Sequence, residues 1–372
     1  MSGVNLASKY SKKVDEKFAL EELTGAMGGA DYDFVGVNAV KVYSIEDAPL
    51  NDYTRSGSQR YGSPAELEDS VQTLTLTQDK AFTFTIDRGN NNEQMMIKEA
   101  GKALARQIKN VVVPTRDAYN LGRAAIEAIN NGNAIYATLS TSNAYEKWLA
   151  ATEIMDEGKV PMKGRKGWVA PSYLNLIKRC SDFTKILEYN KNTKTINGEV
   201  GNMEDVAIVK TPSTYLPVGV KAVLEHPIAM ATPKTLADYK IHDNPPGING
   251  WLVEGRIIYD AFVLNEKAKG IVVVVDGAIL GIKTKSVAGA ATNGTKLSYE
   301  LPEGVKTSDV SSIVYKLNTS AITLPAYGAT FTGGTTYTDA EIAASTNTHY
   351  AIVGLDSNGK AVFADGGTLV KG

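Results

Sequence analysis

The residue types that most often carry catalysis or bind metals are scarce in this sequence, which holds three histidines and one cysteine in 372 residues. His242 directly precedes Asp243, and such a pair could act as a general base with its orienting carboxylate. The pair lies in YKIHDNPPGINGW, whose Pro and Gly residues predict a turn, so a solvated loop histidine is the simpler interpretation. His226 precedes Pro227 at a predicted strand edge and is interpreted as structural. Cys180 falls on the apolar side of a predicted helix, where a small buried thiol is expected.

Other enzyme motifs are incomplete or missing. The segment GAATNGTK at 289–296 half-resembles a phosphate-binding loop, but its lysine stands one place too late, which favours a polar loop. The sequence contains neither the Gly-x-Ser-x-Gly elbow of serine hydrolases nor the His-Glu-x-x-His motif of zinc proteases. We therefore predict that the protein is not an enzyme and uses no metal or cofactor. An enzyme with an unrecognised site centred on His242 and Asp243 is an alternative from another class.

The bulk composition sets further limits. Lys and Arg number 39 and Asp and Glu 41, a net charge of −2, which argues against a dedicated nucleic-acid binder but permits weak local contact. A single cysteine excludes an internal disulfide framework. The first 20 residues carry no apolar signal-peptide block, and the most apolar run, 270–282, is too short to span a bilayer. We expect a soluble protein made in the cytoplasm, with two or three domains.

A long polar insert at 46–70 separates a predicted strand at 35–45 from a predicted hairpin. Apolar residues alternate from 71 to 87, which predicts a two-faced hairpin that turns near residues 78–80. An insert of this length is uncommon in a compact domain and is usually functional or disordered. Aromatic and arginine side chains suit contact with a partner, and we predict that the insert contacts a neighbouring subunit. Its candidate contact residues are Tyr53, Arg55, Arg60 and Tyr61.

A long helix is predicted from 93 to 112, because apolar residues there recur every three or four positions. Pro114 is expected to end it, and a second helix is predicted at 117–129. The apolar stripe along one face of this helix predicts that this face packs into the core of the subunit. Its core residues are Ile97, Leu104 and Ile108.

The remaining chain divides into a glycine-rich start, a mixed middle and a β-rich end. Residues 1–34 are glycine-rich near their end and predict an arm with no core of its own. Further helices are predicted to begin at Asn143 and at Pro171, and 197–275 is rich in strands. The tail, 276–372, has its own strand alternation and an Asn-Gly hairpin turn, which predict a separate small β module.

The middle of the chain resembles the central region of tailed-phage major capsid proteins. The resemblance rests on MDEGKVPMKGRKGWVAPSYLNLI, where Asp-Glu, Val-Pro, a Gly-Arg pair, a short apolar strand and a helix-opening proline follow one another. The residues are Asp156-Glu157, Val160-Pro161, Gly164-Arg165, Trp168-Val169 and Pro171. The segments GNMEDVAIVKTPSTYLP and GWLVEGRIIYDAFVLNEKAKGIVVV look like the strands that follow in that family, so the resemblance covers about residues 1–275.

The resemblance implies an α+β chain with the HK97-type capsid fold. This fold has an N-terminal arm, an extended loop, a long spine helix in a peripheral domain, and an axial domain. The expected divisions are the arm at 1–34, the extended-loop hairpin at 35–90, the peripheral and axial domains at 91–275, and a C-terminal β module at 276–372. The module resembles immunoglobulin-like or other small β domains that some capsid proteins carry as surface decoration.

The implied function is that of a major capsid protein that self-assembles into the icosahedral shell around phage DNA. Expected partners are other copies of the chain in hexamers and pentamers, a separate scaffolding protein, a portal, and double-stranded DNA through weak non-specific contacts. No membrane partner is expected. The protein would be assembled in the host cytoplasm and located in the virion capsid. An encapsulin-like compartment that encloses cargo protein is the alternative with the same fold.

Overall fold

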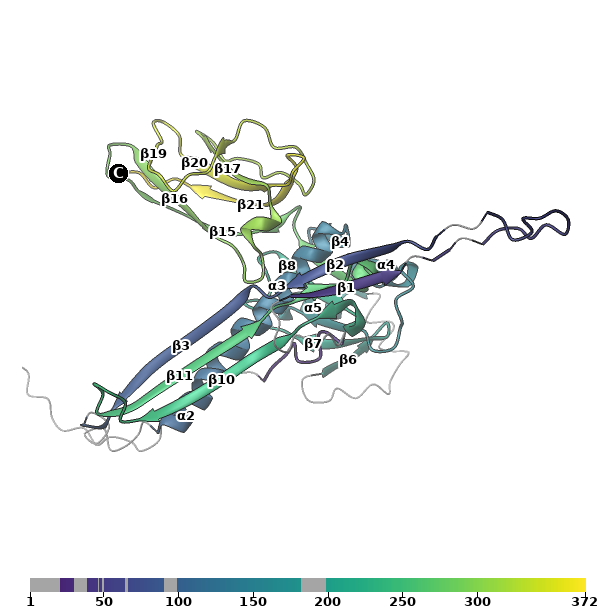
Figure 1. Cartoon of the computed structure of the whole chain (residues 1–372). Coiled ribbons are helices and arrows are strands. Elements are labelled where there is room, and N and C mark those ends of the chain that lie inside the picture. The colour runs from purple at the N-terminus through teal and green to yellow at the C-terminus, as the bar shows by residue number, and fades with distance from the viewer. Residues whose placement is uncertain are drawn as a thin grey trace, which may run out of the picture.

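The molecule consists of a central body from which three parts project. The computed structural model describes residues 21–29, 39–45, 47–48, 50–63, 66–89, 99–181 and 199–372. In Figure 1 a two-stranded arm extends to the right, a long sheet with a helix alongside extends to the lower left, and a β module lies above the body.

A six-stranded mixed sheet forms the body. Its strands, in spatial order, are β4 (Ala134–Ala137), β13 (Ile271–Asp276), β8 (Val220–Glu225), β5 (Lys166–Val169), β7 (Val206–Lys210) and β6 (Glu199–Met203). The sequence IVVVV in β13 is buried on both faces of the sheet, as near-continuous apolar strands are. Val272 and Val274 join one apolar cluster with α4 (Ala144–Glu157) and α5 (Pro171–Arg179), while Val273 and Val275 join a second cluster with α3 (Val113–Asn130). Pro171 opens α5, as the sequence predicts.

The spine helix continues past the proline that was expected to end it. It comprises α2 (Ala100–Gln107), a π-helical turn at Ile108–Val112, and α3. Pro114 comes two residues after the last residue of the π turn and lies in the first turn of α3. A π turn widens the helix locally, and we infer that this widening accommodates both the proline ring and its missing N–H donor. The prediction of two helices separated at Pro114 is therefore wrong.

The two described residues of the core predicted for the first helical half are only partly covered in the subunit. Leu104 and Ile108 are only half-buried, and Ile97 lies outside the described residues. Within the described residues, α2 lies beside the sheet of β10, β11 and β3, away from the body (Figure 1). In contrast, α3 passes through the body, and most of its side chains are buried.

The sheet beside α2 is antiparallel and contains a strand that was predicted to pair elsewhere. Its strands are β10 (Lys234–Asp243), β11 (Gly250–Tyr259) and β3 (Gln78–Asp87). β3 pairs along its whole length with β11, from Gln78 opposite Tyr259 to Asp87 opposite Gly250, so the hairpin predicted to turn at 78–80 does not form. Alternating apolar residues fit any partner strand of the right parity, and here the distant β11 provides it.

The arm consists of β1 (Ala39–Ile45) and β2 (Asp69–Thr75), paired antiparallel from Ala39 opposite Thr75 to Ile45 opposite Asp69. The polar insert therefore connects the outer ends of the two arm strands, as an extended loop requires, although β1 rather than β3 is the partner of β2. Near the body, β12 (Phe262–Val263) pairs with β9 (Met230–Ala231).

The strands of the C-terminal part of the chain form two sheets, joined by long irregular segments and one short 3-10 helix at Thr307–Asp309. The strands of the first sheet are β14 (Leu280–Gly281), β21 (Ala361–Thr368), β20 (His349–Leu355), β17 (Ser312–Asn318) and β18 (Thr335–Thr336). Those of the second are β15 (Lys283–Ala288), β16 (Gly294–Glu300) and β19 (Ile342–Ala343). β20 and β21 form the predicted hairpin, and Gly359 in its turn has a φ of 71°, a left-handed conformation that favours glycine.

Candidate functional site: the projecting arm and its root

The candidate catalytic pair does not form. His242 Nε2 lies 3.2 Å from Glu254 Oε2, whereas Asp243 Oδ1 accepts a hydrogen bond of 2.9 Å from Arg88 Nη2. Adjacent residues of β10 point to opposite faces of the sheet, so each finds a different partner. His242 therefore has no orienting contact from Asp243.

The other candidate residues have structural surroundings, as the sequence indicates. The backbone N–H of Ile228 donates to His226 Nδ1 over 3.3 Å, and His226 Nε2 lies 3.1 Å from the carbonyl oxygen of Lys163. Cys180 is buried. In the described part of the chain, no group of three or more His, Cys, Asp or Glu residues could hold a metal ion. Nor is any described helix both long and apolar enough to cross a membrane.

The segment 289–296 is closed by a carboxylate. Glu341 Oε1 accepts a hydrogen bond of 2.7 Å from the backbone N–H of Ala291. The carboxylate thus takes a donor that a bound phosphate would need, and its charge would repel one. This geometry agrees with a structural loop.

The tip of the arm brings the four predicted contact residues together on an exposed turn. Tyr53 and Tyr61 pack edge to face with ring centroids 5.0 Å apart, and the backbone N–H of Thr54 donates to the carbonyl oxygen of Arg60 over 3.0 Å. Tyr53, Arg55, Arg60 and Tyr61 are all exposed. Tyr61 is 83% exposed, an unusual position for a large aromatic ring in a subunit without a partner.

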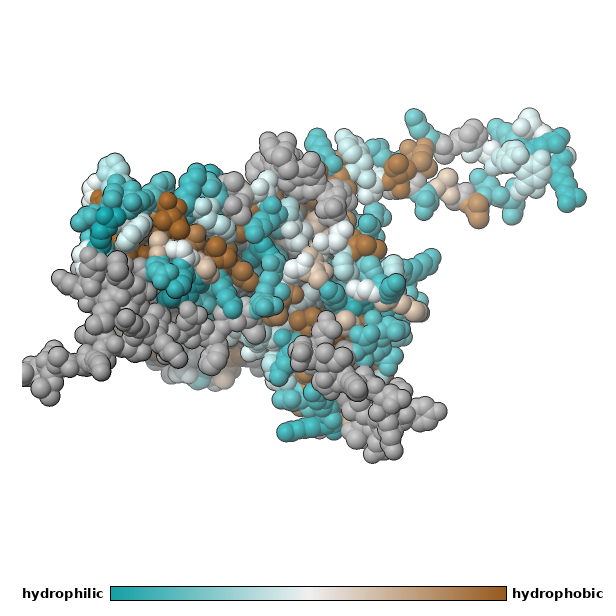
Figure 2. Space-filling model, turned by 90° about the horizontal axis from the view of Figure 1, so that it is seen from below, coloured by the Kyte–Doolittle hydropathy of each residue, from teal (hydrophilic) through white to brown (hydrophobic). Residues whose placement is uncertain are grey.

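The stem of the arm has an outward apolar face that the sequence analysis missed. Tyr43, Ile45 and Val71 are 64%, 70% and 48% exposed. Tyr43 lies directly opposite Val71 in the strand pairing, so the side chains form one patch. Figure 2 shows the arm extending free of the body, with hydrophobic side chains in brown along it. The available signal was the stretch VKVYSI, which is apolar at both parities and therefore needs cover on both faces.

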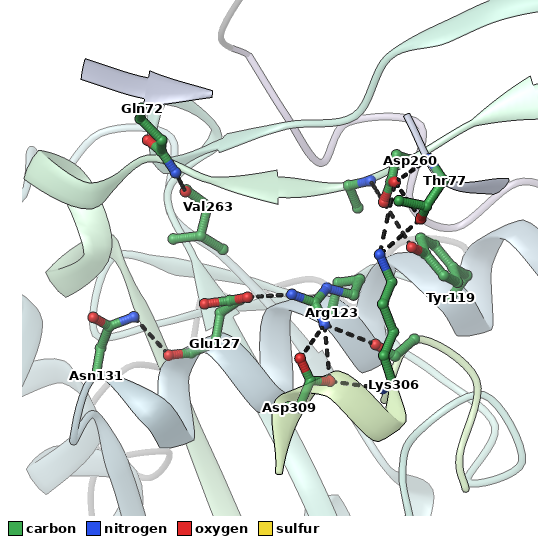
Figure 3. A network of polar contacts seen from close by, with 12 residues as sticks. Gln72, Thr77, Tyr119, Arg123, Glu127, Asn131, Asp260, Val263, Lys306 and Asp309 are labelled. Carbon is green, nitrogen blue, oxygen red and sulfur yellow. Dashed lines mark hydrogen bonds and ion pairs between the residues drawn. The ribbon is translucent and has the colours of Figure 1, made fainter. Parts of the chain in front are cut away.

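The opposite face of the stem is anchored at its root. Leu74 and Leu76 are buried with Leu264 in a small apolar cluster. Gln72 Nε2 donates to the carbonyl oxygen of Val263 over 2.8 Å (Figure 3). Gln72 Oε1 accepts from the backbone N–H of Asn265 over 3.2 Å. Among the described residues, the arm thus contacts the body at its root, where Val40 and Val42 of β1 also pack against the cluster.

A buried carboxylate holds the link between the arm and β3. Asp260 accepts hydrogen bonds from the N–H and hydroxyl of Thr77, at 2.8 and 2.7 Å, and from the Tyr119 hydroxyl at 2.6 Å. Burial raises the pKa of Tyr119 far above its ordinary value, and its hydrogen bond to Asp260 raises it further, so the neutral hydroxyl is the donor. Lys306 Nζ, from the C-terminal module, donates to Thr77 Oγ1 over 2.8 Å and lies 3.8 Å from Asp260 Oδ2.

A second ionic group joins the module to the spine helix. Arg123 Nη1 donates to both oxygens of Asp309 over 3.0 Å and to the carbonyl oxygen of Gly304 over 3.2 Å, while Arg123 Nη2 pairs with Glu127. Burial lowers the pKa of Arg123, but the carboxylates of Asp309 and Glu127 raise it by more, so the guanidinium stays charged. Figure 3 shows these contacts beside the arm root.

The module also touches the helix backbone to backbone. A Cβ on Gly122 of α3 would lie 1.7 Å from the carbonyl oxygen of Glu303, and one on Gly304 would lie 2.4 Å from the carbonyl oxygen of Tyr119. Gly304 has a φ of 84°. Only glycine allows this approach. The module is therefore closely fitted to the body at this junction.

The described N-terminal segment, 21–29, is docked into the body, contrary to the expectation of an arm without a core. Asp117 accepts from the N–H of Leu23 at 2.9 Å and from the Thr24 hydroxyl at 2.6 Å. The N–H of Gly28 donates to the buried carboxyl of Glu225 over 3.4 Å. Burial raises the pKa of Glu225 to about 8, because the apolar surroundings disfavour its charged form. The rest of the predicted arm lies outside the described residues.

Solved phage structures share this fold. The chain is similar to a chain of "Mycobacterium phage Che8" with a TM-score of 0.56, 16% identity, and cover of 73% of this chain and 97% of that one. It is similar to "Capsid structure of the Cyanophage P-SCSP1u" with a TM-score of 0.56, 11% identity, and cover of 73% and 93%. For "Asymmetric unit of bacteriophage PhiM1 mature capsid" the TM-score is 0.57, with 10% identity and cover of 72% and 91%. The chain therefore has a fold found in phage capsids.

A different relationship covers the end of the chain. Residues 287–364 match the family model of the S-layer protein SbsC C-terminal domain. The search of curated proteins gives no match. The solved phage chains are covered almost completely while about a quarter of this chain is left over, so this chain carries additional structure beyond theirs.

Proposed function

We propose that this chain, which has a fold found in phage capsids, is a tailed-phage major capsid protein that assembles into an icosahedral shell around DNA. The observation that carries the proposal is the arm, whose outer face presents Tyr43, Ile45 and Val71 to solvent. An exposed apolar patch of this kind marks a contact surface. A second copy of the chain is the natural partner, because shells consist of identical subunits in repeated contact.

In this proposal the arm lies across a neighbouring subunit. The apolar stem would lose its contact with water, and the tip residues Tyr53, Arg55, Arg60 and Tyr61 would contact the neighbour beyond it. Each subunit gives an arm to one neighbour and receives another from the opposite side. Weak single contacts then stabilise a closed particle, because each subunit makes several of them at once.

The finer assignments belong to the same proposal. The fold would be of the HK97 type, with hexamers and pentamers as building units, a separate scaffolding protein and a portal as partners, and weak contact with packaged double-stranded DNA. The shell would be assembled in the host cytoplasm and located in the virion. The phage names of the similar structures favour a phage shell over an encapsulin-like cargo compartment.

We propose further that residues 276–372 form a β module on the outer surface of the shell. The module would be a small β-sandwich of the immunoglobulin-like type. The family match to an S-layer domain at 287–364 supports a role at an exterior surface. An inward module would take volume from the DNA.

Electron microscopy of the purified chain tests the main proposal. We expect closed shells of uniform size that contain nucleic acid when they come from infected cells. Deletion of residues 50–66 should leave a soluble, folded subunit that forms no shells, with an unchanged unfolding temperature as the control for folding. Normal shells from the deletion variant would contradict the role of the arm.

A further inference from the structure

The direction of the arm depends on a very short link. β2 ends at Thr75 and β3 begins at Gln78, so only Leu76 and Thr77 connect the arm to the sheet beside α2. The arm and this sheet point away from the body in opposite directions (Figure 1). Groups that hold these two residues therefore contribute, together with the contacts of Gln72 and Leu74, to the angle at which the arm leaves the body.

One of the groups that hold the link comes from the C-terminal module. Asp260 and Tyr119 belong to the body, but Lys306 reaches Thr77 from a loop more than two hundred residues later in the chain. Its ammonium donates to the same hydroxyl that donates to Asp260, and it also lies within 3.8 Å of that carboxylate. Lys306 thus contacts both Thr77 of the link and Asp260 of the body.

The loop that carries Lys306 is itself held rigidly. The backbone N–H of Lys306 donates to Asp309 Oδ2 over 2.6 Å, and the same carboxylate is paired with Arg123 of the spine helix. Gly304, two residues earlier, touches the helix backbone. The position of the ammonium is therefore determined by the spine helix as well as by the module.

We propose that Lys306 is a positioning residue for assembly, and that the C-terminal module braces the arm root and fixes the direction of the arm. The consequence for assembly rests on the proposed capsid function, since a fixed arm direction would set the angle between neighbouring subunits and thereby the curvature of the shell. The brace itself is a property of the single subunit. It can be measured without any shell.

The test is a distance measurement by pulsed electron spin resonance on unassembled subunits. Spin labels are attached through Asp69→Cys at the outer end of the arm stem and Glu153→Cys on α4, both exposed sites. The native Cys180 is buried and stays unlabelled. The distance distribution is compared between the labelled parent and the same chain carrying Lys306→Met.

A matched control comes from the module itself. Lys360 Nζ donates to the hydroxyl of Thr330 over 3.0 Å, a bond of the same kind as that of Lys306, but made within the module. Lys360→Met should leave the arm-to-body distribution unchanged. A second test variant, Thr77→Val, removes the hydroxyl at the link while it preserves side-chain shape.

We expect Lys306→Met and Thr77→Val to broaden the distribution about two-fold, because a released arm samples more orientations by loop motion. Distributions as narrow as those of the parent and of Lys360→Met, in variants that remain folded, would overturn the brace. Shells are examined separately. If the parent chain forms none, the capsid function fails while the distance comparison still decides the brace.

Discussion

The arm and the C-terminal module both extend from the same body, but they differ in the solvent exposure of their apolar side chains. The module's Tyr350, Ile352 and Phe363 are buried in the same cluster as Ile126 of the spine helix. The arm leaves most of its outer-face apolar side chains in water. The module therefore buries many of its apolar side chains against the body, whereas the described outer face of the arm stays exposed, as the proposed contact between copies would need.

The junction between module and spine helix and the junction between arm and body also differ in the kind of contact that forms them. The module meets the helix through paired glycines and buried ion pairs, which tolerate little change in distance. The arm is anchored by a few leucines and one glutamine at its root, and its outer length is free. Close backbone contacts thus mark an interface completed on folding, and in the proposed function the exposed apolar strands are the interface left for assembly.

Of the changes that test this comparison, removal of the module should have the largest effect on the stability of the subunit. Truncation after Val275 exposes Arg123 and Glu127 without Asp309 and uncovers one side of the apolar cluster. Apolar side chains of the spine helix and the body sheet that the module covers would then contact water, and their hydrophobic stabilisation would be lost. We expect no cooperative thermal unfolding from the truncated chain by near-ultraviolet circular dichroism. A cooperative transition, together with normal shells, would mean that the module is separable and that the junction contributes little.

The next largest effect is expected on the pH dependence of stability, through Glu225 beneath the docked N-terminal segment. The folded pKa of Glu225, about 8, lies above its ordinary value of 4.5, so the native state keeps a proton that the unfolded state releases in between. Stability should therefore fall as pH rises from about 4.5 to about 8. The fall should be about 5 kcal/mol at most, since one pKa unit corresponds to about 1.4 kcal/mol.

Denaturant unfolding at pH 5 and pH 8 measures this dependence. Glu225→Gln removes the titrating group and should flatten the difference between the two pH values. An equal pH dependence in both proteins would show that other groups cause it.

The glycine contact between module and helix should give a somewhat smaller effect. Gly122→Ala places a methyl group 1.7 Å from the carbonyl oxygen of Glu303, so the junction must open. We expect a loss of about 3 kcal/mol in the free energy of unfolding, at the upper end of overpacking effects. Gly101→Ala on the same helix is the control, because its Cβ has open space around it. That substitution should stabilise the subunit by up to about 1 kcal/mol, and equal effects at both sites would contradict the close approach.

The smallest effect is expected on the exposed half of the spine helix. Leu104→Ala should cost about 1 kcal/mol in the unassembled subunit, less than the 2–5 kcal/mol of a fully buried leucine, because Leu104 is half-buried. Leu121→Ala, at a fully buried position of the same helix, should reach about 2–5 kcal/mol. Urea unfolding of both variants measures the difference, and equal losses would mean that α2 is packed as tightly as α3.

Local signals in the sequence predicted the elements better than their partners. Pro171 at a helix start and the Asn358-Gly359 turn depend on the backbone preferences of these residues, and both appear where expected. The insert between the arm strands was also recognisable, because polar residues of that number have no place in a core. These features depend on a few neighbouring residues.

Features that depend on distant segments could not be predicted. β3 pairs with β11, more than 160 residues away, and its alternation carries no information about which partner it meets. The helix continues through Pro114 because the π turn before it relieves the proline, which a propensity rule does not foresee. The site around Asp260 combines residues from three remote segments, and no spacing in the sequence brings Thr77, Tyr119 and Lys306 together.

The central claim is that the outer face of the arm is a contact between copies, and one sedimentation measurement tests it most directly. Val71→Asp on the arm and Val370→Asp on the module make the same substitution at 48% and 49% exposed positions. The fraction of protein that sediments as closed shells is measured for both variants under conditions in which the parent assembles. The account predicts that Val71→Asp abolishes shells while the subunit stays folded, and that Val370→Asp assembles like the parent. Full assembly of Val71→Asp would contradict the account.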